Sequence, residues 1–145
     1  MSHSSLTGSV QLHGFSRSFQ GKQVLDDVHL DIAPGQFVAL LGESGSGKTT
    51  LLRALASLDA EARSSGAAVA HGKVSVLFQD SRLLPWLTVL DNLTLGLDAQ
   101  AARSAALQLL REVGLEDKAA AWPATLSGGQ KQRAALARSL LREPH

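Results

Sequence analysis

The segment from Gly42 to Thr49 constrains this chain more than any other, because it reads GESGSGKT and matches the pattern G-x-x-x-x-G-K-[S/T] in full. It lies between an apolar run at 37–41, typical of a strand buried on both faces, and a run at 49–58 that predicts a helix. In such a loop, glycines let backbone N–H groups approach phosphate oxygens, the lysine reaches the β- and γ-phosphates, and the final hydroxyl binds Mg²⁺. The structural alternative is a glycine-rich turn that happens to contain a lysine. Motif and context together predict a nucleoside triphosphate site, here named the phosphate loop, with contacts from Gly42, Ser44, Gly45, Gly47, Lys48, Thr49 and Thr50.

Composition narrows the class of protein. The 145 residues allow one domain at most, and 44% hydrophobic with 19% charged residues is ordinary for a globular protein. A formal net charge of +1 supplies no basic field, so we expect no nucleic-acid partner. The lack of cysteine excludes disulfides, cysteine zinc sites and thiol catalysis, and the five histidines have no metal-ligand spacing. Without a signal-peptide pattern or an apolar stretch of roughly 20 residues, we expect a soluble, cytosolic chain.

The order of the expected elements predicts an α/β fold. Strands come first, then the phosphate loop with its helix, then another apolar strand, and the second half is helical. A capping-box pattern at Thr88 and a stop at Gly114 mark helix ends, and polar residues at 59–66 predict a loop. The expected strands are 10–19, 28–32, 37–41 and 73–78, and the expected helices are 49–58, 88–97, 101–113 and 127–144.

A second candidate anion site lies at the start of the last helix, in the sequence TLSGGQKQR. Backbone N–H groups at a helix start lack intrahelical partners, and the helix dipole favours negative charge there. Ser127 and Gln130 also have the S-x-x-Q spacing of a capping box, which is a purely structural explanation. That explanation does not cover Gly128 and Gly129, since glycine in a helix costs roughly 1 kcal/mol relative to alanine. From these residues alone, the helix cap and the ligand site both stay open.

Two motifs together carry a resemblance to a known family. The stretch LSGGQ followed by KQR resembles the signature motif of ABC-transporter ATPases, and it follows the phosphate loop in the order that this family has. Gln79, at the end of an apolar run, resembles the glutamine of the family's Q-loop. More narrowly, the sequences at 77–86, 91–92 and 122–123 resemble ATPase subunits of aliphatic sulfonate importers, with nitrate and taurine importers as close cousins.

The resemblance implies a P-loop NTPase core with an antiparallel β subdomain and an α-helical subdomain, in an incomplete ABC ATPase domain over residues 1–145. The nucleotide-binding core and β subdomain would occupy about 1–80, the helical subdomain about 81–126, and the signature helix 127–145. Two features depart from the family: Ser57 stands where a glycine is usual, and the segment 61–73 is a short, weak match. The second departure weakens the expectation of the small antiparallel sheet.

The resemblance also implies how the two motifs work. In this family two ATPase subunits pair head to tail, so that each ATP lies between the phosphate loop of one subunit and the signature helix of the other. Lys48 and Gln79 take the catalytic positions, and Thr49 and Gln79 are the expected Mg²⁺ ligands. The signature residues expected to contact ATP held by the partner copy are Ser127, Gly128, Gly129 and Gln130.

Phe19 falls where the family places an aromatic residue that stacks on adenine. Such stacking is worth about 1–3 kcal/mol per base in nucleic-acid binders. The structural alternative is that Phe19 packs a strand face, as Phe15 four residues earlier would, and the family position favours stacking. We interpret Trp86 and Trp122 as core or groove residues rather than ligand contacts, and expect residues 82–86 to line a groove for a permease.

The implied partners are transmembrane permease subunits and, indirectly, a periplasmic solute-binding protein. The ATPase would lie on the cytoplasmic side of the inner membrane as a peripheral subunit, and would couple ATP hydrolysis to uptake of aliphatic sulfonates or related oxyanions. One alternative is a soluble small-molecule kinase, in which LSGGQ has no place. Another is a non-transport ABC ATPase acting on DNA or ribosomes, which usually carries long insertions after the Q-loop. A third is a shortened product that binds nucleotide without transporting.

The last residues, Arg142 to His145, resemble the turn before a strand that ends in Asp-Glu in the family, whose carboxylates hold Mg²⁺ and polarise the attacking water. Those carboxylates are not among the 145 residues, and Asp80 does not replace them, since the Arg-Leu-Leu-Pro sequel fits the Q-loop. We therefore expect a truncated ATPase that is poorly soluble and does not hydrolyse ATP alone. The measurement is Mg-ATP turnover by the purified chain. Turnover that Lys48→Ala abolishes would contradict this expectation.

Overall fold

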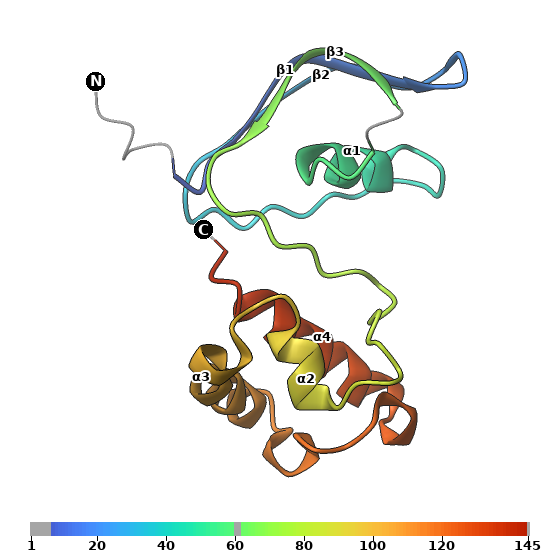
Figure 1. The fold of residues 1–145 in the computed structure, drawn as a ribbon. Coiled ribbons are helices and arrows are strands. Elements are labelled where there is room, and N and C mark those ends of the chain that lie inside the picture. Colours follow the sequence, from blue (N-terminus) through green and yellow to red (C-terminus); the bar gives the residue numbers. More distant parts are fainter. Residues whose placement is uncertain (1–6, 60–61, 145) are drawn as a thin grey trace. The chain divides into compact units, whose positions relative to one another are not determined.

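The chain folds into two separate compact units. The computed structural model describes residues 7–59 and 62–144. One unit extends to Val74 and the other spans Ser75–Pro144 (Figure 1); they are named the N-terminal unit and the helical unit. Within the described ranges, no helix combines the length and the apolar character needed to cross a bilayer.

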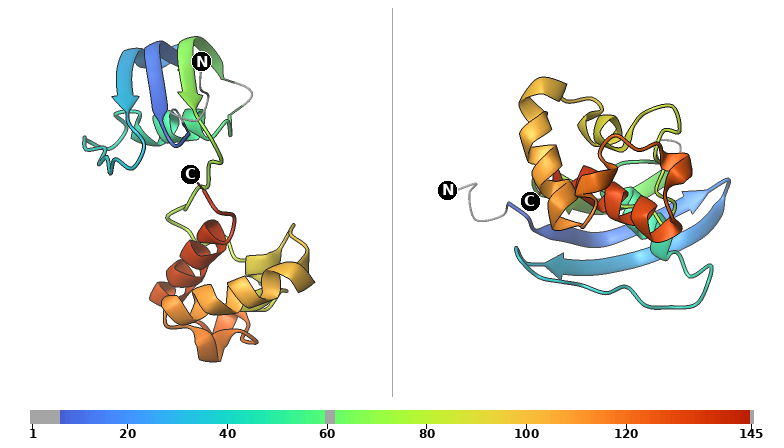
Figure 2. Two further views of the ribbon diagram at one scale, coloured as in Figure 1. Left: turned by 90° about the vertical axis from the view of Figure 1, so that its left-hand side faces the viewer. Right: turned by 90° about the horizontal axis from the view of Figure 1, so that it is seen from below.

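The N-terminal unit is built on a three-stranded antiparallel sheet with the strand order β2-β1-β3 (Figures 1 and 2). Strand β1 (Val10–Phe19) lies in the middle, paired with β2 (Lys22–Ile32) on one side and with β3 (Arg63–Ala70) on the other. Between β1 and β2, Gln20 and Gly21 have φ angles of 47° and 82°. Two successive positive φ angles are what a two-residue type I′ hairpin requires, so this turn sets the start of the β1–β2 pairing.

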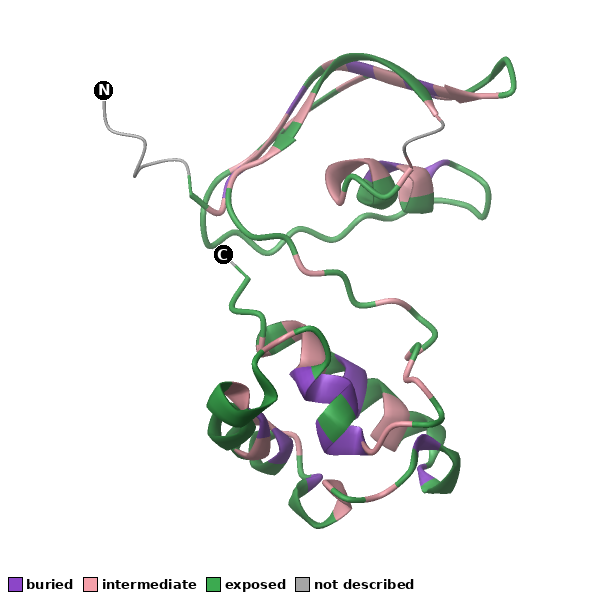
Figure 3. Ribbon diagram, viewed as in Figure 1, coloured by how far each residue is buried: buried purple, intermediate pink, exposed green. Residues whose placement is uncertain are grey.

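Helix α1 (Lys48–Leu55) packs on one face of this sheet, and Figure 3 shows buried residues on both the sheet and the helix. Strand side chains alternate between the two faces, so Val28 and Leu30 are half-buried while His29 and Asp31 are exposed. Burying a large apolar side chain stabilises a fold by about 1.5–3 kcal/mol. The core of this unit consists of Leu12, Phe15, Leu25 and Leu51.

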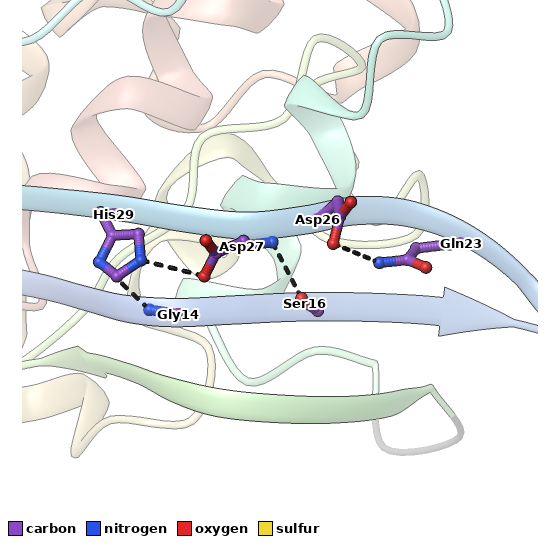
Figure 4. Close-up of polar contacts among 6 residues, drawn as sticks. All are labelled: Gly14, Ser16, Gln23, Asp26, Asp27 and His29. Carbon is purple, nitrogen blue, oxygen red and sulfur yellow. Dashed lines mark hydrogen bonds and ion pairs between the residues drawn. The ribbon is translucent and has the colours of Figure 1, made fainter.

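The pairing of β1 with β2 is irregular, and polar side chains satisfy the backbone where the register shifts (Figure 4). Gly14 and Asp27 have left-handed φ angles of 58° and 47°. The Asp27 N–H donates to Ser16 Oγ at 2.9 Å, and the Gly14 N–H donates to His29 Nδ1 at 3.4 Å. Because Nδ1 accepts, a neutral His29 carries its proton on Nε2, which donates to the Asp27 carboxylate at 3.0 Å. These bulges are therefore stabilised by side chains of the strands themselves.

The two apolar runs predicted to be buried strands, 37–41 and 73–78, are not strands. They follow an irregular path and expose large side chains: Phe37 is 96% exposed and Leu41 is 88% exposed. A strand needs neighbours that hydrogen-bond its backbone, and neither run belongs to the sheet that the described residues form. The prediction was wrong because apolar character does not by itself supply a pairing partner.

The small antiparallel sheet, which the weak family match argued against, is present. Its third strand, β3, occupies part of the 59–66 segment that was expected to be a loop, of which residues 60 and 61 lie outside the described ranges. Ser, Ala and Gly dominate this strand, so no hydrophobic alternation predicted it. It forms because its backbone pairs with β1 along almost its whole length.

In the helical unit, α2 (Val89–Thr94), α3 (Ala99–Glu112) and α4 (Gly128–Leu140) pack around one apolar core (Figures 2 and 3). Two short 3₁₀ turns, η2 (Glu116–Lys118) and η3 (Pro123–Thr125), lie between α3 and α4. The apolar face of each helix points into this core, as the amphipathic pattern predicts. Its fully buried members include Val89, Leu93, Ala106, Leu110, Ala134 and Ala137.

Two helix ends in this unit follow the predicted caps, whereas α4 ends at Leu140, before the predicted end at Pro144. Thr88 Oγ1 accepts the Asp91 N–H at 3.2 Å at the start of α2. Gly114 follows α3 with a φ of 67°, in the left-handed position that ends many helices. Helix α2 ends at Thr94, earlier than predicted, and Gly96 turns the chain with a φ of 75°.

Helix α1 also ends in a left-handed residue, which explains why a glycine was expected at position 57. Ser57 has a φ of 54°. Its N–H donates to the Ala54 carbonyl at 3.0 Å, and the Leu58 N–H donates to the Arg53 carbonyl at 3.0 Å. This is the Schellman pattern, in which the left-handed position favours glycine because a Cβ is crowded there.

We expect Ser57→Gly to raise the free energy of unfolding by about 1 kcal/mol, because glycine adopts this conformation without the Cβ penalty. Ser57→Ala is the matched control: it keeps the Cβ and should change the stability by less than about 0.5 kcal/mol. Urea unfolding followed by circular dichroism measures both variants. A glycine variant no more stable than the alanine variant would rule out this account of the helix end.

Candidate functional site

The phosphate loop leads directly into α1, and three of its glycines adopt conformations that other residues rarely take. The φ angle is 153° at Gly42, 83° at Gly45 and 91° at Gly47. Gly47 is the N-cap of α1, and no described side chain caps this helix start. The N–H groups of the first turn are therefore not engaged by a side chain, as anion binding at a helix start requires.

Gly47 also fixes the loop against the sheet. It is buried, and a Cβ added to it would lie 2.9 Å from Leu25 Cδ2 and 3.1 Å from the Val24 carbonyl oxygen. A residue without a Cβ thus allows the start of α1 to come this close to β2. A Cβ added to Gly45 would meet no described atom within 4 Å, so its φ angle alone favours glycine there.

The ammonium group of Lys48 lies across the phosphate loop. Its Nζ donates to the Gly42 carbonyl at 2.7 Å, to the Glu43 carbonyl at 2.5 Å and to Ser46 Oγ at 3.2 Å. An ammonium group has three N–H donors, so the loop accounts for all of them. The positive charge is thereby held over the loop, where phosphate oxygens would compete for the same donors.

The other predicted residues of the phosphate loop lie in the same short segment. Ser44 and Thr49 are exposed, and Thr50 is half-buried in the first turn of α1. The Thr49 hydroxyl is an oxygen ligand of the kind that Mg²⁺ prefers. Across 7–59 and 62–144, no group of three or more His, Asp or Glu side chains could hold a metal.

Phe19 ends β1 in the same unit and does not share the environment of Phe15. Phe15 is buried in the core, whereas Phe19 is half-buried and is not part of that core cluster as the structure describes it. The guanidinium carbon of Arg17 lies 5.7 Å from the centroid of the Phe19 ring. The strand-packing explanation therefore fits Phe15 better than Phe19, whose ring keeps surface that a base could contact.

In the helical unit, the start of α4 forms a complete capping box. Ser127 Oγ accepts the Gln130 N–H at 3.2 Å, and Gln130 Oε1 accepts the Ser127 N–H at 2.8 Å. The structural explanation of these two residues is confirmed. Gly128 and Gly129 are different: they are exposed, have no positive φ, and an added Cβ would meet no described atom within 4 Å. The described fold does not require these two glycines, and their contact with an approaching ligand or partner stays a prediction.

Gln79 lies in a bend at the start of the helical unit, and its side chain is exposed. The backbone shortly after it is strained, since Arg82 has a φ of 47°. The Arg82 guanidinium carbon lies 3.7 Å from the centroid of the Phe78 ring. A non-glycine residue in this conformation costs about 1–3 kcal/mol and persists where its surroundings hold it.

Arg138 of α4 holds this strained segment, although the sequence analysis did not identify it. Its Nη1 donates to the Arg82 carbonyl at 2.9 Å, and its Nη2 donates to the Ser81 carbonyl at 2.8 Å. Burial, together with the nearby charge of Arg142, lowers the pKa of Arg138. The signature helix and the segment after Gln79 are thus joined by two charge-assisted hydrogen bonds.

Asn92 of α2 holds the next part of the same segment. It is fully buried, accepts the Leu84 N–H at 2.7 Å and donates to the Leu84 carbonyl at 3.0 Å. Its amide also donates to the carbonyls of Leu87 and Thr88. The sequence does carry a signal for Asn92, because it stands among the apolar residues of a predicted helix. A buried amide there needs hydrogen-bond partners. Arg138 gave no such signal, since its partners lie more than fifty positions away.

A surface pocket of about 290 Å³ lies beside the segment held by Arg138. Its lining comes from the 80–85 segment, from η3 and from α4, and includes Arg82, Leu83, Pro85 and Lys131. Trp86 and Trp122 are exposed, so neither is a core residue.

The predicted site residues fall into two sets. The phosphate loop and Phe19 belong to the N-terminal unit, and Gln79 and the signature residues belong to the helical unit. Each set contains one helix start able to face an anion, α1 in the first and α4 in the second.

We expect Arg138→Ala to loosen the segment after Gln79 and to lower the stability of the helical unit by about 1–3 kcal/mol, because two carbonyls lose a charged donor. The measurement is amide hydrogen exchange of a peptide covering residues 79–87. Arg142→Ala is the matched control, since Arg142 donates to the Leu95 carbonyl instead. Exchange in that peptide that stays slow in the Arg138 variant would show that this arginine does not hold the segment.

Comparisons with known proteins show which family this chain is similar to. Residues 25–145 match the ABC transporter family, which includes the phosphate loop and the signature helix. Over all 145 residues the chain is 88% identical to an aliphatic sulfonates import ATP-binding protein of Delftia acidovorans, of which it covers 60%. It is 64% identical over 142 residues to such a protein of Paracoccus denitrificans. That match covers 98% of this chain and 59% of the relative. The chain thus spans less than two thirds of the length of these relatives.

The family match confirms the predicted α/β P-loop NTPase fold class with its antiparallel sheet, and it implies that the nucleotide is ATP. It also accounts for the LSGGQ segment, which the small-molecule kinase alternative left unexplained. On these grounds the chain belongs to the ABC transporter family.

Proposed function

We propose that this chain is the nucleotide-binding part of an ABC importer ATPase that drives uptake of aliphatic sulfonates or related oxyanions. The observation that carries the proposal is the 88% identity, over the whole chain, to a protein named as an aliphatic sulfonates import ATP-binding protein. The phosphate loop adds physical support, because its glycine conformations, uncapped helix start and lysine suit a triphosphate.

In this proposal the N-terminal unit binds ATP and Mg²⁺. Backbone N–H groups from Gly42 to Thr50 donate to the phosphates, and Lys48 exchanges its loop carbonyls for β- and γ-phosphate oxygens. The Thr49 hydroxyl would hold Mg²⁺, which neutralises phosphate charge when it is bound. Phe19 offers its ring to adenine.

The start of α4 serves a second copy of the chain. Two copies pair head to tail, and each presents its signature helix to the ATP held by the other. Gly128 and Gly129 let the backbone approach the γ-phosphate closely, which fits their open surroundings. Ser127 and Gln130 fix the direction of the helix start through the capping box.

The segment after Gln79 connects the nucleotide to the permease. Gln79 would orient the attacking water, and residues 82–86 would line the groove that receives a permease subunit, beside the pocket at Arg82. A periplasmic solute-binding protein would deliver the solute on the other side of the inner membrane. The ATPase itself would be peripheral on the cytoplasmic side.

The test is a Lys48→Ala substitution in the gene that encodes this chain, with growth measured on an alkanesulfonate as sole sulfur source. We expect growth on the sulfonate to be lost and growth on sulfate to be unchanged, because the lysine charge is required at the phosphates. Lys118→Ala is the control, since this lysine pairs with Asp117 in the helical unit and is not one of the predicted site residues. Normal growth of the Lys48 variant on the sulfonate would refute the proposal.

A further inference from the structure

A buried arginine lies next to the proposed adenine platform. Arg17 is 6% exposed, stands two residues before Phe19 in β1, and donates from Nη2 to the Asp59 carbonyl at 2.6 Å. Nη2 also lies 3.7 Å from the Asp59 carboxylate. Its Nε has no hydrogen-bond partner among the described residues. A guanidinium is removed from water at a considerable energetic cost, so its burial here calls for a role that a smaller apolar residue would not perform.

Asp59 connects this arginine to α1. Its side chain is 11% exposed and also receives Arg53, whose Nη2 lies 2.6 Å and whose Nε lies 2.8 Å from Oδ1. Arg53 is in the last turn of α1, and the first turn of the same helix carries Lys48 and Thr49. One carboxylate therefore ties β1 to the helix that begins at the phosphate loop.

The other side of the Arg17 guanidinium faces Phe19. Its Cζ lies 5.7 Å from the ring centroid, within the range of a cation–π interaction. Phe19 is the last residue of β1, before the Gln20-Gly21 turn, and is not held by the core of the unit as described. Arg17 thus connects this ring to α1 through Asp59.

We propose that Arg17 is a positioning residue for the nucleotide: with Asp59 and Arg53 it forms a clamp that keeps the Phe19 ring at a fixed place relative to the phosphate loop. The proposal rests on the proposed function, in which Phe19 meets the base and Lys48 meets the phosphates. When the clamp is lost, the base loses its platform while the loop glycines and Lys48 stay in place, since their contacts do not involve Arg17.

Because the proposal affects binding of the base and not of the phosphates, two ligands that differ in the base test it. The purified chain is titrated with ATP and with inorganic tripolyphosphate, which has the phosphates but no base. We expect Arg17→Met to weaken ATP binding about tenfold and tripolyphosphate binding less than about twofold, as loss of one stacked base implies. Arg63→Met, which removes an exposed arginine of β3, is the matched control and should change neither.

A double variant shows whether Arg17 acts on ATP binding by positioning Phe19 or by a separate contact of its own. Phe19→Ala should weaken ATP binding as much as Arg17→Met does, and the double variant should lose little more, because both substitutions remove the same contact. Parallel loss of ATP and tripolyphosphate binding in Arg17→Met would overturn the proposal, as would unchanged ATP binding or fully additive losses.

Two further variants keep the outcome decisive. Circular dichroism shows whether Arg17→Met folds. If it does not, Arg53→Gln, at the exposed end of the clamp, replaces it. This variant should also weaken ATP binding more than tripolyphosphate binding. Lys48→Ala separates this proposal from the proposed function: if it leaves both ligands bound, the nucleotide site itself is wrong. If Lys48→Ala weakens both but Phe19→Ala weakens neither, the site stands and the clamp proposal fails.

Discussion

Backbone polar groups in irregular segments need partners, and in this chain a few side chains supply them. Lys48 holds the carbonyls of the phosphate loop, Arg138 holds the carbonyls after Gln79, and Asn92 holds the turn before α2. Ser16 does the same for a bulge in the sheet. Each of these hydrogen bonds holds its segment in the conformation that the structure shows.

The same contacts hold the irregular backbone of the phosphate loop before α1 and of the segment after Gln79. The phosphate loop is fixed at one end by the close packing of Gly47 on β2 and across its width by Lys48. The segment after Gln79 is joined to the signature helix through Arg138. At both places hydrogen bonds join the irregular backbone to a helix, through Lys48 of α1 and through Arg138 of α4.

Local features of this chain could be predicted from the sequence, and long-range ones could not. The caps at Thr88 and Ser127, the left-handed Gly114 and the helix after the phosphate loop each depend on a few adjacent residues, and all four are present. Strand β3 was missed because its backbone pairing does not depend on apolar side chains, and the runs at 37–41 and 73–78 were mispredicted because pairing partners do not follow from hydrophobicity. Arg17 and Arg138 were missed because their partners lie far along the chain.

The capping box at the start of α4 has a consequence for the hydroxyl group of Ser127. A hydroxyl has one proton and two lone pairs, and the cap occupies a lone pair by accepting the Gln130 N–H. The proton is not used by the cap and is free to point out of the helix start, in the direction where backbone N–H groups also point. The cap and the ligand site are thus not competing explanations of the same serine. One uses its oxygen as an acceptor, and the other would use its hydrogen as a donor to an anion.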